Sequence, residues 1–123
     1  MRYQTDYLLR LIEELSGLIR QALEKLGVKD AGAPSELAGQ AIGLALDMDP
    51  HLAAGLSPES LVSLLRLGDL DDRVVALVQQ AIEVEATALE DRGDAVAAGF
   101  RREQAGAIRS LLEAKAGRPG SAS

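Results

Sequence analysis

Apolar residues recur along the first part of the chain at the spacing of an α-helix. Between residues 5 and 26 they return every three or four positions, and at about 100° per residue they fall on one half of a helical wheel. Charged residues occupy the other half, where Asp6 with Arg10 and Arg10 with Glu14 have the spacing of helix-stabilising ion pairs. The pattern predicts a long amphipathic N-terminal helix, with an apolar half formed by Leu8, Leu11, Ile12, Leu15, Leu18, Ile19, Ala22, Leu23 and Leu26.

This apolar half is wider than the strip that one neighbouring helix normally covers. One interpretation is that the surplus, including Leu8, Leu11, Leu15 and Leu18, binds a second copy of the chain or another protein. The other interpretation is that the helix is central and is packed on both flanks within its own chain. The sequence leaves both open.

Helix start and stop signals divide the rest of the chain. Ser35 and Ser57 precede apolar runs as candidate N-caps, and Gly68 and Gly93 interrupt such runs, with Asp94 as the cap of the last helix. A loop is expected over residues 28–34 and a helix-turn-helix at Gly68. Helices are expected over residues 36–47, 58–67, 71–91 and 95–116, and a flexible tail over residues 117–123.

These elements predict an all-α fold of about five helices, in which the long first helix is followed by antiparallel helical hairpins. The length of 123 residues favours a single domain, expected over residues 1–116. Aromatic residues make up only 2% of the chain, so the core must be filled by Leu, Ile, Val and Ala. Such a core suits close packing of helices better than a β-sandwich.

Gly39 and Gly43 stand inside the expected helix over residues 36–47. Each glycine costs a helix about 1 kcal/mol relative to alanine, so a compensating contact is expected. Close approach of another helix backbone is the usual compensation. This small-residue face is therefore a second candidate surface for self-association.

Two of the turns resemble a known repeat family. LGDLD over residues 67–71 and RGDA over residues 92–95 are similar to turns of tetratricopeptide repeats, and AIGLALDMDP over residues 41–50 resembles the end of such a repeat. The stretch DYLLRLIE over residues 6–13 is also similar to the start of certain small bacterial helical proteins. The tetratricopeptide resemblance implies helical hairpins that present a groove to a partner or stack into oligomers.

Charge and cysteine content exclude several classes of function. With 13 basic and 19 acidic residues the net charge is −6, which argues against nucleic acid as a main partner. The chain has no cysteine, so disulfides and thiolate chemistry are excluded. No apolar run is long enough to span a membrane, and the N-terminus does not resemble a signal peptide, so the expected location is the cytoplasm.

Glu85 is the residue that departs most clearly from the pattern around it. It stands in the middle of the apolar half of the expected helix over residues 71–91, where an unpaired carboxylate would be costly. In a hairpin that turns at Gly93, position 85 lies opposite position 101, so Arg101 or Arg102 could meet it. A structural ion pair is the preferred interpretation, and a carboxylate in a binding groove is the alternative.

Other candidate groups do not form a recognisable reactive site. Asp69, Asp71 and Asp72 lack the spacing of a calcium loop and fit helix capping better. His51 is the only histidine and is expected in a loop after Pro50, where binding of a metal is a remote alternative. No serine has the surroundings of a catalytic nucleophile. No catalytic, cofactor-binding or metal-binding residue is therefore assigned.

The sequence predicts a non-enzymatic protein-protein interaction or scaffolding module. Self-association through the first helix or the glycine face is expected, with no cofactor. One alternative is a small-molecule binder, or an unrecognised enzyme, with a pocket between helices around Glu85. A peripheral membrane role is the third possibility.

Overall fold

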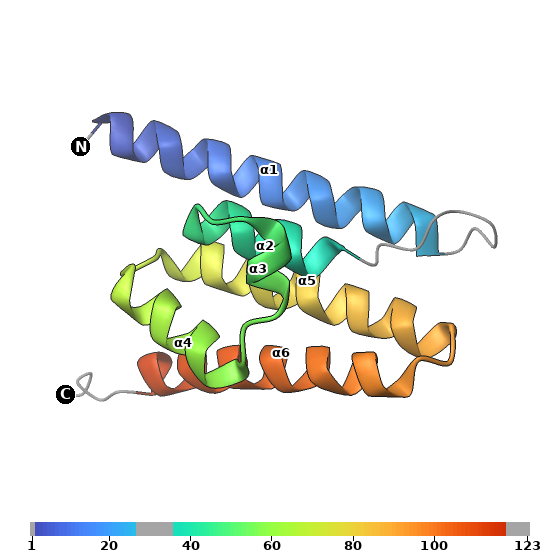
Figure 1. Ribbon diagram of the computed structural model, residues 1–123. Helices are drawn as coiled ribbons and strands as arrows, with labels where there is room; N and C mark the ends of the chain where they lie inside the picture. The colour runs from blue at the N-terminus through green and yellow to red at the C-terminus, as the bar shows by residue number, and fades with distance from the viewer. Residues whose placement is uncertain (1, 27–35, 118–123) are drawn as a thin grey trace.

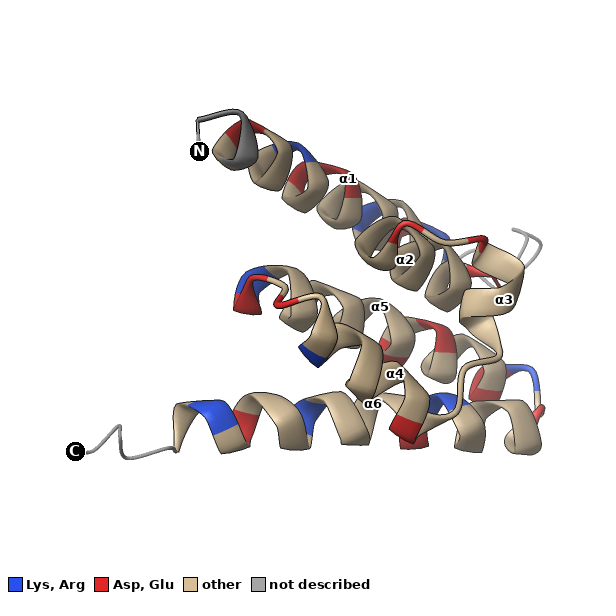
Figure 2. Ribbon diagram, turned by 60° about the vertical axis from the view of Figure 1, so that its left-hand side comes forward, with Lys and Arg blue, Asp and Glu red and all other residues tan. Residues whose placement is uncertain are grey.

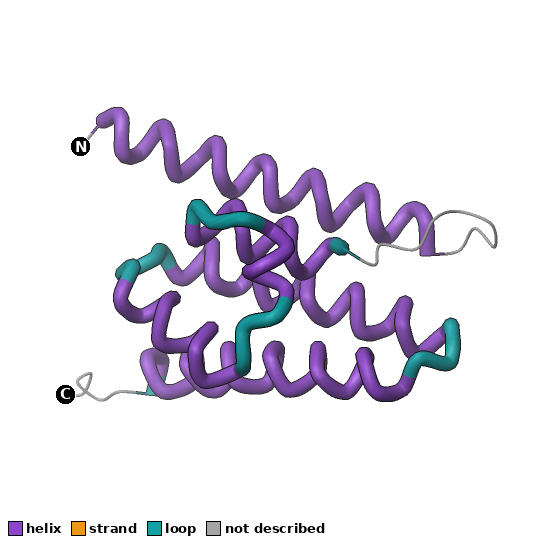
Figure 3. The backbone as a smooth tube through the Cα atoms, viewed as in Figure 1, coloured by secondary structure: helices purple, strands orange, loops and turns teal. Residues whose placement is uncertain are grey.

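The chain is helical throughout the residues that can be described. The computed structural model describes residues 2–26 and 36–117, and these contain six helices and no strand (Figure 3). The prediction of an all-α fold of about five helices is therefore confirmed. The helices are α1 (Arg2–Leu26), α2 (Leu37–Leu46), α3 (Pro50–Ala54), α4 (Pro58–Leu67), α5 (Asp72–Asp91) and α6 (Ala95–Ala116). The loop predicted over 28–34, the cap residue Ser35 and the tail after Gly117 lie outside the described residues.

The three long helices lie side by side, with α5 between α1 and α6 (Figure 1). The short helices α2, α3 and α4 lie in front of this row in the view of Figure 1. α5 and α6 form the predicted antiparallel hairpin through Gly93. The helix-turn-helix expected at Gly68 does not pack as such a hairpin, because α4, which precedes that turn, lies mainly against α6 and not against α5. α2 packs against α1, α3 and α5, so it links the N-terminal helix to the rest of the molecule.

Most of the buried apolar residues form one cluster to which all six helices contribute. Its buried members are Leu, Ile, Val and Ala, as the low aromatic content predicted. Phe100 is only half-buried, and Tyr7 is exposed. The wide apolar half of α1 is divided, because Leu11, Leu15, Ile19 and Ala22 are buried, others are half-buried, and Leu23 is exposed.

Local capping explains where most of the helices begin. The side chains of Ser57, Asp71 and Asp94 accept hydrogen bonds from backbone N–H groups of the first turns of α4, α5 and α6, at 3.1, 2.8 and 3.2 Å. Gly93 has φ of +82°, a conformation that glycine adopts without the penalty of a side chain. α2 is the exception, because it begins one residue later than expected and its cap residue Glu36 makes no side-chain cap.

The sequence prediction missed α3. Pro50, after which a loop was expected, is the first residue of α3. Asp49 caps that helix by accepting a hydrogen bond from Leu52 N at 3.4 Å. His51 therefore lies in a helix and not in the predicted loop. A helix of five residues is too short to show a period of apolar positions, so only its cap and proline could have indicated it.

Gly39 and Gly43 let α3 lie directly against α2. A Cβ atom added at Gly39 would lie 2.6 Å from Pro50 O, and one added at Gly43 would lie 2.8 Å from Met48 O. The predicted close approach of a second backbone is therefore confirmed. It takes place within the chain, between two helices that follow each other in the sequence.

Candidate functional site

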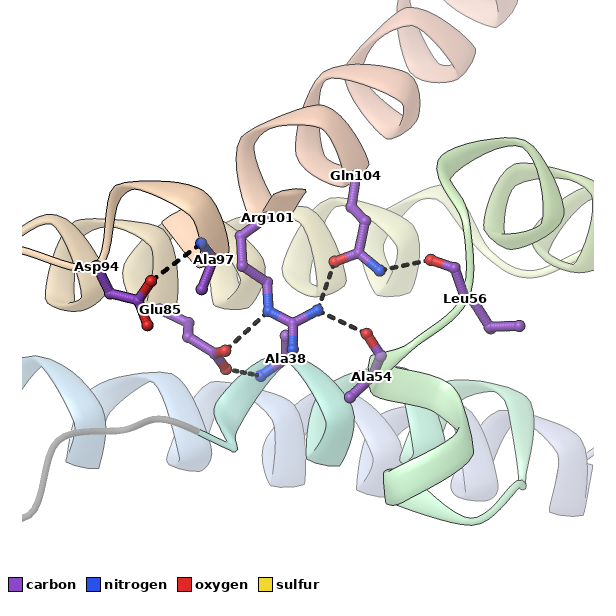
Figure 4. A network of polar contacts seen from close by, with 8 residues as sticks. All are labelled: Ala38, Ala54, Leu56, Glu85, Asp94, Ala97, Arg101 and Gln104. Carbon is purple, nitrogen blue, oxygen red and sulfur yellow. Dashed lines mark hydrogen bonds and ion pairs between the residues drawn. The ribbon is translucent and has the colours of Figure 1, made fainter. Parts of the chain in front are cut away.

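Glu85 is the acidic residue at the centre of a buried polar cluster. It lies on α5 with 1% of its surface exposed, and its Oε2 accepts a hydrogen bond from Arg101 Nε on α6 at 2.8 Å (Figure 4). The predicted pair between Glu85 and Arg101 is confirmed. Arg102 was the other predicted partner, and it pairs with Glu90 on the surface instead, at 2.8 Å. Arg102 is therefore not part of the buried cluster.

The second carboxylate oxygen of Glu85 caps a helix that is distant in the sequence. Its Oε1 accepts a hydrogen bond from Ala38 N at 2.7 Å, in the first turn of α2. Backbone N–H groups in a first helical turn have no partner within their own helix and carry partial positive charge. Because Glu36 supplies no side-chain cap, the carboxylate from α5 takes that role for α2.

Arg101 and Gln104 extend the cluster to the end of α3. Arg101 Nη1 donates to Ala54 O at 2.7 Å and to Gln104 Oε1 at 2.8 Å, and Gln104 Nε2 donates to Leu56 O at 2.9 Å (Figure 4). Gln104 is fully buried, and no buried side-chain nitrogen or oxygen lacks a partner in the described residues. Both oxygens of Glu85 are thus used to join α2, α5 and α6, which is an arrangement that stabilises a fold.

An open groove lies between α1 and the α2–α3 pair, and we call it the α1–α2 groove. Its volume is about 620 Å³. Tyr7, with 59% of its surface exposed, lies on its α1 side, and the half-buried Leu44 and Met48 lie on the opposite side. The residues that line it are Tyr7, Arg10, Leu11, Glu14, Leu18, Gln40, Gly43, Leu44, Asp47, Met48 and Pro50.

Three of the candidate partner-binding residues meet in this groove. Leu11 and Leu18 line it from α1, and Gly43 lines it from α2, although the sequence placed them on two separate surfaces. The other apolar candidates have different positions: Leu15 is fully buried in the core, and Leu8 is half-buried against it. The apolar half of α1 is wide because part of it packs into the core and another part forms one wall of the α1–α2 groove.

Two of the other cavities are lined in part by residues of α6. One, of about 380 Å³, is lined by Arg101 and Gly39 together with Glu36, Pro50, His51, Ala54 and Gly55. Glu85 does not line it, because its carboxylate faces α2 and Arg101. The other, of about 740 Å³, lies between α4 and α6.

Two of the three clustered aspartates, Asp71 and Asp72, make ion pairs within the chain. Asp71 caps α5 and pairs with Arg73 at 3.0 Å, and the hydrogen bond from the Arg73 side chain lowers the pKa of the Asp71 carboxyl. Asp72 pairs with Lys115 of α6. Within residues 2–26 and 36–117, no group of three or more acidic or histidine side chains could hold a metal ion.

Comparison with known proteins adds no assignment. No family model matches the chain, and no curated protein or solved structure is significantly similar to it. The resemblance to tetratricopeptide repeats therefore stays a prediction. In the part of the chain that the structure describes, no helix is long and apolar enough to cross a membrane.

Proposed function

We propose that this chain is a non-enzymatic interaction module that works in the cytoplasm and self-associates through the α1–α2 groove. The observation that carries the proposal is the groove itself, where Leu11, Leu18 and Gly43 meet beside the exposed ring of Tyr7. Grooves of this kind, with apolar side chains on the walls, accept an amphipathic helix from a partner.

The balance of polar groups supports binding rather than chemistry. The buried carboxylate of Glu85 and the guanidinium of Arg101 are joined to each other and to backbone groups. The groove offers apolar surface from Leu44 and Met48, whose coverage by a partner would contribute about 25 cal/mol per Å² before the entropic cost of association.

Sedimentation velocity over a wide range of protein concentration tests the proposal. We expect a concentration-dependent dimer or larger oligomer for the natural sequence. Tyr7→Ser should weaken the association while changing the free energy of unfolding by less than about 0.5 kcal/mol, because Tyr7 is mostly exposed.

Leu9→Ser is the matched control, since Leu9 is also an exposed apolar residue of α1 but does not line the groove. Equal weakening by both substitutions would place the contact elsewhere on α1. A monomer at every concentration would refute self-association.

Small-molecule binding is the second candidate, and the cavity beside Arg101 favours it. Arg101 Nη2 makes no hydrogen bond in the described residues, so it could donate to a ligand there. A thermal-shift screen would reveal such a ligand by an increase in melting temperature. His51→Ala should then reduce the shift, because His51 lines this cavity and not the α1–α2 groove.

A further inference from the structure

Two opposite charges on α1 face the α1–α2 groove without a partner. Arg10 and Glu14 both line the groove. Their spacing predicted an ion pair within the helix, but none forms, and neither residue joins any ion pair in the described residues. Asp6 was the other expected partner of Arg10, and that pair does not form either. The two charged side chains are therefore available to a partner.

We propose that the groove binds α1 of a second copy of this chain, running antiparallel, so that Arg10 of each copy pairs with Glu14 of the other. A two-fold axis between the two helices makes the pairs equivalent and closes the assembly as a dimer. The inference rests on the self-association proposed above and specifies its partner, direction and register.

The charges along α1 favour the register in which Arg10 lies opposite Glu14 over registers shifted by one helical turn and over a parallel pairing. Acidic and basic residues alternate along the helix (Figure 2). A shift by one helical turn in one direction places Arg10 opposite Arg10 of the second copy, and a shift in the other direction places Glu14 opposite Glu14. A parallel pairing in register also brings like charges together. Like charges opposite each other disfavour these alternatives.

The apolar residues of the same face fit the same register. Tyr7 and Leu18 line the groove about three helical turns apart, on either side of Arg10 and Glu14. In the antiparallel pair, Tyr7 of one copy therefore lies against Leu18 of the other, which covers the exposed ring. Gly17, which is opposite Tyr7 of the second copy in this register, has no atom within 4 Å of the position of an added Cβ.

Charge reversal provides a direct test. Arg10→Glu places two acids opposite each other in both symmetric pairs, and Glu14→Arg does the same with two bases. Each single variant should dimerise about tenfold more weakly than the natural chain in sedimentation equilibrium at low salt. An equimolar mixture of the two variants should form a heterodimer of near-natural affinity, and the double variant R10E/E14R should recover homodimerisation.

Arg20→Glu is the matched control, because it makes the same charge change on α1 at a position that does not line the groove. It should leave the dimer affinity unchanged. Circular dichroism of each variant establishes that the helices are intact. A misfolded variant would not regain affinity when it is mixed with the other, so recovery of dimer affinity in the mixture rules out a folding defect.

The outcomes separate the register from self-association itself. A dimer that tolerates both reversals, or a mixture in which affinity is not recovered, overturns the antiparallel register and leaves self-association standing. A natural chain that stays monomeric overturns both.

Discussion

Glu85 with Arg101, and Arg10 with Glu14, are the same two kinds of charged side chain in two different surroundings. The first pair is buried between α5 and α6, and both oxygens of Glu85 have partners within the chain. The second pair lies on the wall of the α1–α2 groove, and neither member has an ion-pair partner in the described residues. An acidic and a basic side chain that are buried against each other stabilise the fold. The same two kinds of side chain on an open groove, without an ion pair in the described part of the chain, can bind a partner.

Loss of the Glu85 carboxylate should have the largest effect on the fold. We expect Glu85→Leu to lower the free energy of unfolding by about 3 to 5 kcal/mol, since it leaves Arg101 buried without its counter-charge and removes the cap of α2. Urea denaturation followed by circular dichroism measures this change.

Glu90→Leu is the matched control, because Glu90 pairs with Arg102 on the surface of the same two helices. An exposed pair contributes no more than about 1 kcal/mol. Equal effects of the two substitutions would mean that burial of the Glu85 pair has no special role.

Gly43 on α2 and Gly17 on α1 allow the same comparison between a packed surface and an exposed one. Gly43→Ala should lower the free energy of unfolding by about 1 to 3 kcal/mol, because the added methyl group would collide with Met48 O.

Gly17→Ala should raise the free energy of unfolding by up to about 1 kcal/mol, since alanine is the better helix former and its methyl group meets nothing within 4 Å. Thermal and urea denaturation check both values, and destabilisation by Gly17→Ala would show that α1 is packed more closely than the structure indicates.

The smallest expected effect concerns pH. Arg73 lowers the pKa of Asp71 in the folded protein, so the charged carboxylate stabilises the fold above its unfolded pKa, near 3.9, and this contribution is lost as pH falls through the folded value. Asp71→Asn keeps a capping side chain but removes the charge, so it should flatten the dependence of stability on pH below about pH 4. Unfolding measured from pH 3 to pH 6 tests this, and an unchanged slope would contradict the role of Arg73.

The local elements of this fold could be predicted from the sequence because their signals are local. Ser57 and Asp94 cap the helices where they were expected to. Asp71, one of the aspartates expected to cap, is the cap of α5 instead of its first residue. Gly93 sets the hairpin that brings Glu85 and Arg101 together. The contacts of Glu85 with Ala38, and of Gln104 with Leu56, could not be predicted in this way. They join residues 47 and 48 positions apart, and the periodic pattern within one helix carries no information about contacts between distant helices.

The groove was predicted only in parts. The period of α1 indicated that Leu11, Leu15 and Leu18 share a face, but not that Leu15 would be covered by its own chain while Leu18 borders the groove. Gly43 was recognised as a site of close approach, yet the helix that approaches it, α3, was missed. Which side of an amphipathic helix is covered depends on the arrangement of all its neighbours.

The central position of α5 also bears on how the molecule opens. α5 contacts α1, α2 and α6, and Val78, Ala81 and Ile82 on it are completely buried. Backbone amides in its middle can exchange with solvent only when those neighbouring helices separate from it, whereas amides near the start of α1 need only local fraying. Hydrogen exchange would therefore separate an early-opening start of α1 from a late-opening centre at α5.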